Sequence, residues 1–125
     1  RIVGELKKLS LYAGANSVKR ILERAGYRVE LASDGQEALE RFDADERYDL
    51  VVTDVIMPRL SGPKLYDAVR ARGDATPFLF TSGYPADEMD RMESARPDLP
   101  ILRKPWTAAH LLERVREAMG ETDAA

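Results

Sequence analysis

The chain has 125 residues, 44% of them hydrophobic, which is enough to bury the core of one domain over residues 1–125. Its 19 Lys and Arg against 22 Asp and Glu give a net charge of −3, which argues against direct binding to nucleic acid. Because it has no Cys and only one His, His110, the sequence excludes disulfide scaffolds, cysteine catalysis and most metal sites built on Cys or His. No apolar run is long enough to span a membrane, so we expect a cytoplasmic protein without direct membrane contact. The first residue is Arg1 rather than Met, and we expect the chain to be a fragment of a longer protein.

From residue 17 onward, short apolar runs alternate with longer stretches of helical periodicity. The pattern predicts, in chain order, helix Ser17–Ala25, strand Tyr27–Ala32, helix Gln36–Phe42, strand Tyr48–Val55, helix Pro63–Arg72, strand Pro77–Thr81, helix Ala86–Ala95, strand Leu99–Arg103 and helix Thr107–Met119. A further strand is needed at the start, and the pattern alone does not choose between Arg1–Leu6 and Lys8–Ala13. This alternation predicts an α/β fold, with a five-stranded parallel sheet covered by helices on both faces in a doubly wound, flavodoxin-like arrangement.

In such a sheet, ligand sites lie beyond the carboxyl ends of the strands. The polar side chains expected at those ends are Asp54, Thr81, Ser82 and Lys104. Taken singly, each has an ordinary explanation, such as a strand-end Asp that binds loop amides or a solvated loop lysine. Together, a carboxylate, a hydroxyl and an ammonium group on one rim suit the transfer of a phosphoryl group.

The ordered set of motifs resembles the receiver domain of bacterial two-component response regulators, from about Ser17 to the end of the chain. The resemblance rests on Asp54 at the end of an apolar strand and on the segments Met57-Pro58, Gly62, Thr81-Ser82-Gly83-Tyr84-Pro85 and Lys104-Pro105. Gly62 follows Asp54 by 8 residues, Ser82 follows Asp54 by 28, and Lys104 follows Ser82 by 22, all close to the family pattern. The amino-acid sequences around Ser82 and Lys104 are most similar to those of receivers at the C-terminus of hybrid sensor histidine kinases.

The resemblance implies a signalling domain rather than an enzyme. It also implies slow self-catalysed phosphotransfer and dephosphorylation. Asp54 would accept a phosphoryl group from a histidine kinase or a histidine phosphotransfer domain, with Ser82 as the hydroxyl switch and Lys104 as the phosphate-binding lysine. The resemblance also implies a cis bond between Lys104 and Pro105, and partner docking on the last strand and its flanking helices. The resemblance also allows two copies of the domain to form a weak homodimer. Mg²⁺ would bind Asp54 and the backbone carbonyl of Ile56.

Two departures from the family pattern lie at the metal site and at the switch. The family carries an acidic pair at the end of the first strand, and the usual spacing from Asp54 leads to Leu9 and Ser10, which carry no carboxylate. Only Glu5 precedes Glu23 among the acids, and it could bind the metal only if Arg1–Leu6 is the first strand and the following loop is lengthened. We therefore describe residues 1–16 as an atypical first strand and loop, and we expect weak Mg²⁺ binding. Without a metal, Lys104 would pair directly with Asp54. Ile101 stands where an aromatic switch residue is common.

Two alternatives come from other functional classes. One is a degenerate receiver with the same fold, acting as a phosphorylation-independent protein-interaction module. The other is a phosphatase of the haloacid dehalogenase type, which needs a second Asp two residues after the nucleophile, where this chain has Ile56.

Four other features carry expectations of their own. We expect Trp106 to pack at the base of the last helix, Tyr84 to lie at the rim of the site and His110 to be solvated. The polar stretch Ala86–Arg96 has few large apolar residues beyond its two methionines, and we expect its helix to be the most mobile element and to help form the partner surface.

Overall fold

A computed structural model of the chain describes residues 8–12, 16–32, 34–43, 48–55, 60–82 and 85–120, with backbone alone at 8–12, 16 and 17. Its strands are β1 (Lys8–Tyr12), β2 (Arg28–Ala32), β3 (Leu50–Asp54), β4 (Phe78–Ser82) and β5 (Ile101–Arg103). They form one parallel sheet in the order β2-β1-β3-β4-β5, so β3 lies at its centre. The first strand therefore lies within the second of the two candidate segments, and the other candidate, Arg1–Leu6, lies outside the described residues.

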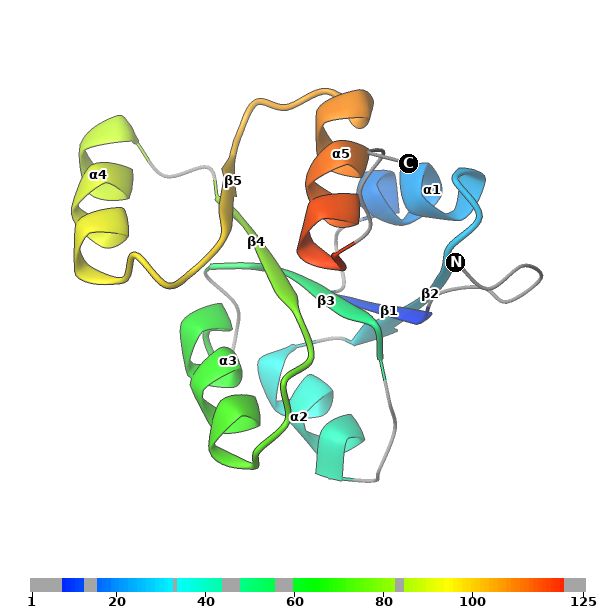
Figure 1. Ribbon diagram of the computed structural model, residues 1–125, viewed down its shortest axis with the longest axis horizontal. Coiled ribbons are helices and arrows are strands. Elements are labelled where there is room, and N and C mark those ends of the chain that lie inside the picture. Colours follow the sequence, from blue (N-terminus) through cyan, green and yellow to red (C-terminus); the bar gives the residue numbers. More distant parts are fainter. Residues whose placement is uncertain are drawn as a thin grey trace.

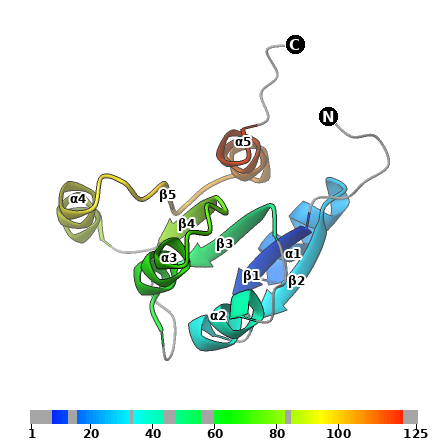
Figure 2. The same cartoon turned by 60° about the horizontal axis from the view of Figure 1, so that its bottom comes forward.

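The helices cover both faces of the sheet. They are α1 (Asn16–Arg24), α2 (Gly35–Asp43), α3 (Gly62–Ala71), α4 (Ala86–Ala95) and α5 (Ala108–Ala118). Helices α2 and α3 lie against one face and α1 and α5 against the other, whereas α4 stands to one side beyond β5 (Figure 1). The second view shows the same separation of α4 from the rest of the molecule (Figure 2). The predicted α/β class is confirmed, with each helix within a residue or two of its expected bounds.

Two apolar clusters fill the space between the sheet and its helices, because alternate residues of each strand point to opposite faces. The α2–α4 core, which is rich in aromatic rings, contains Phe42, Tyr48, Val51, Leu65, Val69, Phe78, Phe80, Met89 and Ile101, among others. The α1–α5 core is mostly aliphatic and contains Val18, Leu22, Leu50, Val52, Leu79, Leu102, Leu111 and Val115. The central strand contributes to both clusters, which explains its uninterrupted apolar run.

Side chains cap the starts of α3 and α5, at Ser61 and Thr107. The Ser61 hydroxyl accepts from the Lys64 N–H at 3.4 Å, and Pro63 occupies the first turn of α3. The Thr107 hydroxyl accepts from the His110 N–H at 3.0 Å at the start of α5. Over the part of the chain that the structure describes, no helix has the length and apolarity to cross a membrane.

Candidate functional site

Asp54 is the last residue of the central strand. The four residues before it, Leu50–Thr53, are buried, whereas Asp54 itself is partly exposed. A carboxylate at this position is held by a rigid, fully packed strand and still reaches solvent. It can therefore act as a nucleophile with a fixed orientation.

The backbone at the start of α3 approaches Asp54 so closely that only glycine fits. The Gly62 N–H donates to the Val55 carbonyl at 3.0 Å, and a Cβ on Gly62 would lie 2.4 Å from the main-chain oxygen of Asp54. Gly62 thus fixes the return of the chain beside Asp54, whereas the sequence identified it only as part of the family motif. The other residues of this motif, Ile56, Met57 and Pro58, lie outside the described residues.

Thr81 is the residue of β4 that contacts the Asp54 carboxylate. It is the register partner of Asp54, and its hydroxyl donates a hydrogen bond to Asp54 Oδ1. Its side chain is buried, with 4% exposure. The sequence placed Thr81 at the strand end but assigned it no role. The missing information was the register between β3 and β4, which decides which of two adjacent hydroxyls lies beside the carboxylate.

Ser82, the expected hydroxyl switch, is also buried. By strand alternation its side chain lies on the face of the sheet that carries Phe78 and Phe80, opposite to that of Thr81. Its main-chain carbonyl accepts from the Lys104 N–H at 2.9 Å, so the ends of β4 and β5 bring these two predicted residues side by side. Their roles in binding phosphate stay predictions.

The expected ion pair between Lys104 and Asp54 is not found among the described residues. Lys104 is exposed, and it follows β5, whose last residue pairs with Ser82 rather than with β3. Since β4 lies between the two, the group beside the Asp54 carboxylate is the Thr81 hydroxyl. The expected pair is therefore wrong for this structure, where the neighbouring strand β4 supplies the contact to the carboxylate through Thr81. The cis bond between Lys104 and Pro105 is confirmed.

The described residues do not fit a metal site with several carboxylates. The family spacing placed Leu9 and Ser10 at the end of the first strand. In the structure they pair with Leu50 and Val51, so they lie in the middle of β1. This shift in register brings no carboxylate to the end of β1, because no acidic residue occurs between Lys8 and Leu22. Within the described ranges there is no group of three His, Cys, Asp or Glu side chains that could hold a metal ion. Glu5 lies outside the described residues.

The end of β5 is tied to α4 by a charged cluster that the sequence did not reveal. Arg103 donates to Glu93 at 2.5 and 3.2 Å and to Asp90 at 2.8 Å. The hydrogen bonds that Arg103 donates to Glu93, and secondly to Asp90, raise the pKa of Arg103. Ile101, two residues earlier, is buried in the α2–α4 core as the partner of Phe80. An aliphatic side chain therefore occupies the position at which the family pattern places an aromatic ring.

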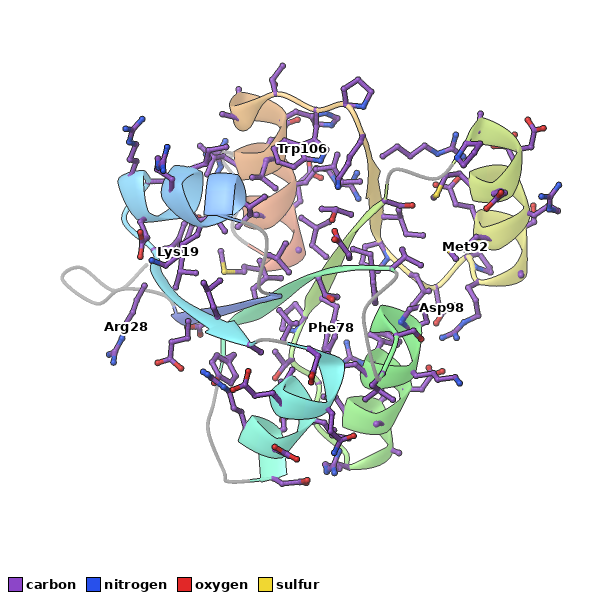
Figure 3. All side chains as sticks on the ribbon, turned by 180° about the vertical axis from the view of Figure 1, so that it is seen from behind. Lys19, Arg28, Phe78, Met92, Asp98 and Trp106 are labelled. Carbon is purple, nitrogen blue, oxygen red and sulfur yellow. The ribbon has the colours of Figure 1, made fainter. Side chains whose placement is uncertain are left out.

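The remaining predicted residues are Trp106, His110 and Tyr84. Trp106 packs against the α1–α5 core beside the start of α5, as expected (Figure 3). His110 is exposed on the first turn of α5, as expected for a solvated side chain. Tyr84 lies outside the described residues.

Comparison with known proteins identifies the family. The model of the response regulator receiver domain matches residues 13–116. Similar curated proteins include the sensor kinase CckA of Brucella abortus, 35% identical over 105 residues, which are 83% of this chain and 11% of that protein. The response regulator MprA of Mycolicibacterium vanbaalenii is 37% identical over 108 residues, which are 85% of this chain and 46% of MprA. The chain thus spans less than half the length of these curated relatives.

Solved structures of similar fold come from the same family. The receiver domain of the sensor histidine kinase PA1611 from Pseudomonas aeruginosa, with a magnesium ion coordinated in its active site cleft, aligns with a TM-score of 0.78 at 25% identity, covering 94% of this chain and all of that one. The chemotaxis response regulator CheY4 of Vibrio cholerae aligns with a TM-score of 0.75 at 29% identity, covering 91% of this chain and 99% of CheY4. Together with the strand-end site at Asp54, these matches show that the chain belongs to the response regulator receiver domain family.

Proposed function

We propose that Asp54 accepts a phosphoryl group from a histidine kinase or a histidine phosphotransfer protein. The observation that carries this proposal is the position of Asp54, a partly exposed carboxylate at the end of the buried central strand. A carboxylate oxygen attacks phosphorus, the bond between phosphorus and the donor nitrogen breaks, and the electron pair leaves with the imidazole. The product is an acyl phosphate on Asp54.

The neighbouring strand ends support the same chemistry. Lys104 is exposed and, within the described part of the chain, has no ion-pair partner, so its ammonium group is available to balance phosphate charge. We propose that Ser82 binds a phosphoryl oxygen after transfer. Both assignments follow from the family motif at these positions, and the chain brings the two residues together at the ends of β4 and β5.

We also propose that divalent metal contributes less here than in the solved relative that holds magnesium. Mg²⁺ in proteins is bound through one or two carboxylates together with waters, and the described residues offer Asp54 without the acidic pair. The charge of the phosphoryl group is then offset mainly by Lys104. Phosphotransfer should accordingly be slow and depend weakly on Mg²⁺.

A mass-spectrometric assay with acetyl phosphate tests the proposal. We expect the wild-type chain to gain the mass of one phosphoryl group, and Asp54→Asn to gain none while losing little stability. Asp49→Asn, an exposed carboxylate before the same strand, is the matched control and should be phosphorylated like the wild type. The assay is run with and without Mg²⁺. An unmodified wild-type chain in both conditions would contradict the proposal.

The second candidate is a phosphorylation-independent interaction module. It is favoured by the lack of a carboxylate between Lys8 and Leu22 and by the buried Ile101 at the aromatic switch position. The two candidates differ in what Asp54→Asn does to partner binding. In the Asp54→Asn variant, a module of this kind keeps its affinity for a sensor kinase. A phosphorylation-dependent receiver loses the difference in affinity between its phosphorylated and unphosphorylated states.

A further inference from the structure

We propose that Thr81 is a positioning residue that holds Oδ1 of Asp54, assigns phosphorylation to Oδ2 and speeds the loss of the phosphoryl group. This inference rests on the proposed function of Asp54 as phosphoacceptor. The Thr81 hydroxyl donates to Oδ1 of the carboxylate, and Thr81 is the direct register partner of Asp54. Neither the family motif nor the spacing of the strand ends assigns a role to this residue.

The packing around Thr81 fixes its hydroxyl in place. The side chain is buried at 4% exposure on the face of the sheet that carries Leu79 and Val52. The Thr81 main-chain carbonyl accepts from the Val55 N–H at 3.1 Å, which ties the two strand ends together at this level. A β-branched side chain in a buried strand has few rotamers, so the hydroxyl is preorganised for the carboxylate.

The bond distinguishes the two oxygens of Asp54. Oδ1 is occupied by the Thr81 hydroxyl, so Oδ2 is the oxygen that attacks phosphorus. In the acyl phosphate, Oδ1 becomes the carbonyl oxygen and keeps its hydrogen bond. That bond is weaker than the one to the carboxylate, because hydrogen bonds to ionised acceptors are about twice as strong as those to neutral ones.

This difference in hydrogen-bond strength affects the rate at which the acyl phosphate is hydrolysed. Water attacks phosphorus, the bond between phosphorus and Oδ2 breaks, and its electron pair returns to the Asp54 carboxylate, while the proton of water leaves with the phosphate or to solvent. Negative charge grows on the carboxylate during this step. The Thr81 hydroxyl stabilises that charge as it forms, so it lowers the barrier to dephosphorylation.

Two variants of Thr81 and one of its neighbour test the proposal on the acetyl-phosphate-treated chain. Thr81→Val keeps the shape and removes the hydroxyl, and we expect its phosphorylated form to hydrolyse about tenfold more slowly than the wild type. Thr81→Ser restores a hydroxyl and should restore the wild-type rate. Thr53→Val removes a buried hydroxyl that donates to the main-chain oxygen of Asp54, so it should change stability but leave the hydrolysis rate unchanged.

A double-mutant cycle tests the contact without any phosphodonor. The unfolding free energies of wild type, Thr81→Val, Asp54→Ala and the double variant should be non-additive, because the two side chains share one hydrogen bond. Additive energies would overturn the proposal. So would equal hydrolysis rates for Thr81→Val and wild type when the wild type is phosphorylated, and in that case the role of Asp54 stands. A wild-type chain that takes up no phosphoryl group overturns both proposals together.

Discussion

Helices α3 and α4 have ten residues each and follow successive strands, yet different forces hold them. Helix α3 buries Leu65 and Val69 against the sheet, and its first turn is capped by Ser61. Helix α4 buries Met89 alone, and Pro85 at its start provides no side-chain cap. The difference separates a helix fixed by apolar packing from one held mainly at its charged side chains.

The charged contacts of α4 run to two neighbours. Arg103 of β5 binds Asp90 and Glu93, and Arg96, just past the helix, binds Asp67 of α3 and Asp98. Asp98 lies in the segment between α4 and the sheet, close to α3 (Figure 3). Ion pairs at the surface are weak and are screened by salt, so they position a helix without locking it. We therefore expect α4 to be the adjustable element of this face.

The largest effect on stability is expected at the start of α3, where the backbone at Gly62 lies against the backbone of Asp54. Gly62→Ala places a methyl group 2.4 Å from the main-chain oxygen of Asp54, so one of the two backbone segments must shift. We expect a loss of about 3 kcal/mol in the free energy of unfolding, measured by urea denaturation. Lys64→Ala, an exposed change in the same turn, should stay within about 0.5 kcal/mol. Equal losses for the two variants would contradict this account of Gly62.

The second prediction compares one core truncation in each helix. Leu65→Ala should lower the global free energy of unfolding by about 3 kcal/mol, because α3 unfolds with the sheet. Met89→Ala should lower it by less, because α4 can detach before the rest of the domain unfolds. Hydrogen exchange measures the same difference in the wild type, with the amides of α4 exchanging faster than those of β3. Equal protection of α4 and β3 would show that α4 is not the mobile element.

The third prediction concerns the charged link from β5. Arg103→Met removes the contacts to Asp90 and Glu93 but keeps an apolar stem. We expect faster hydrogen exchange in α4, a small loss of stability at low salt and a smaller difference from wild type at high salt. Arg91→Met, an exposed arginine on α4, is the control and should leave exchange unchanged. An effect of Arg103→Met that is the same at both salt concentrations would argue for packing rather than charge.

The smallest effect is expected from acid. The hydrogen bond from Arg96 lowers the pKa of Asp98 below its ordinary value of 3.8. The pair therefore stabilises the fold above pH 3.8, and this contribution is lost as the pH falls below that value through the folded-state pKa. Wild type should exceed Asp98→Asn in stability near neutral pH, and the two should converge in acid. A difference that persists well below that pH would place its origin elsewhere.

The sequence predicted the fold well because the periodicities are strong and local. The apolar run around Val51 and the capped start of α3 at Ser61 need no knowledge of distant residues. Strand register is different, because it depends on pairs far apart in the chain. That is why the sequence misplaced Leu9 and Ser10 along β1 and gave Thr81 no role.

Side-chain pairing was the other limit. Spacing placed Lys104 and Asp54 at the same end of the sheet, but only the strand order shows that β4 separates them. Likewise the polar sequence of α4 indicated weak burial, whereas its link through Arg103 required the position of β5 beside it. Sequence patterns locate candidate groups at an edge, and the topology then decides which of them touch.

The place of β1 in the sheet has a consequence for folding. Because β1 pairs with β2 on one side and β3 on the other, the two ladders cannot both form until this segment is inserted between them. A chain that lacks it would leave β2 without a partner strand and would expose the unpaired side of β3 to other molecules. The first strand thus closes the sheet and protects its centre from self-association, whether or not it takes any part in the chemistry at Asp54.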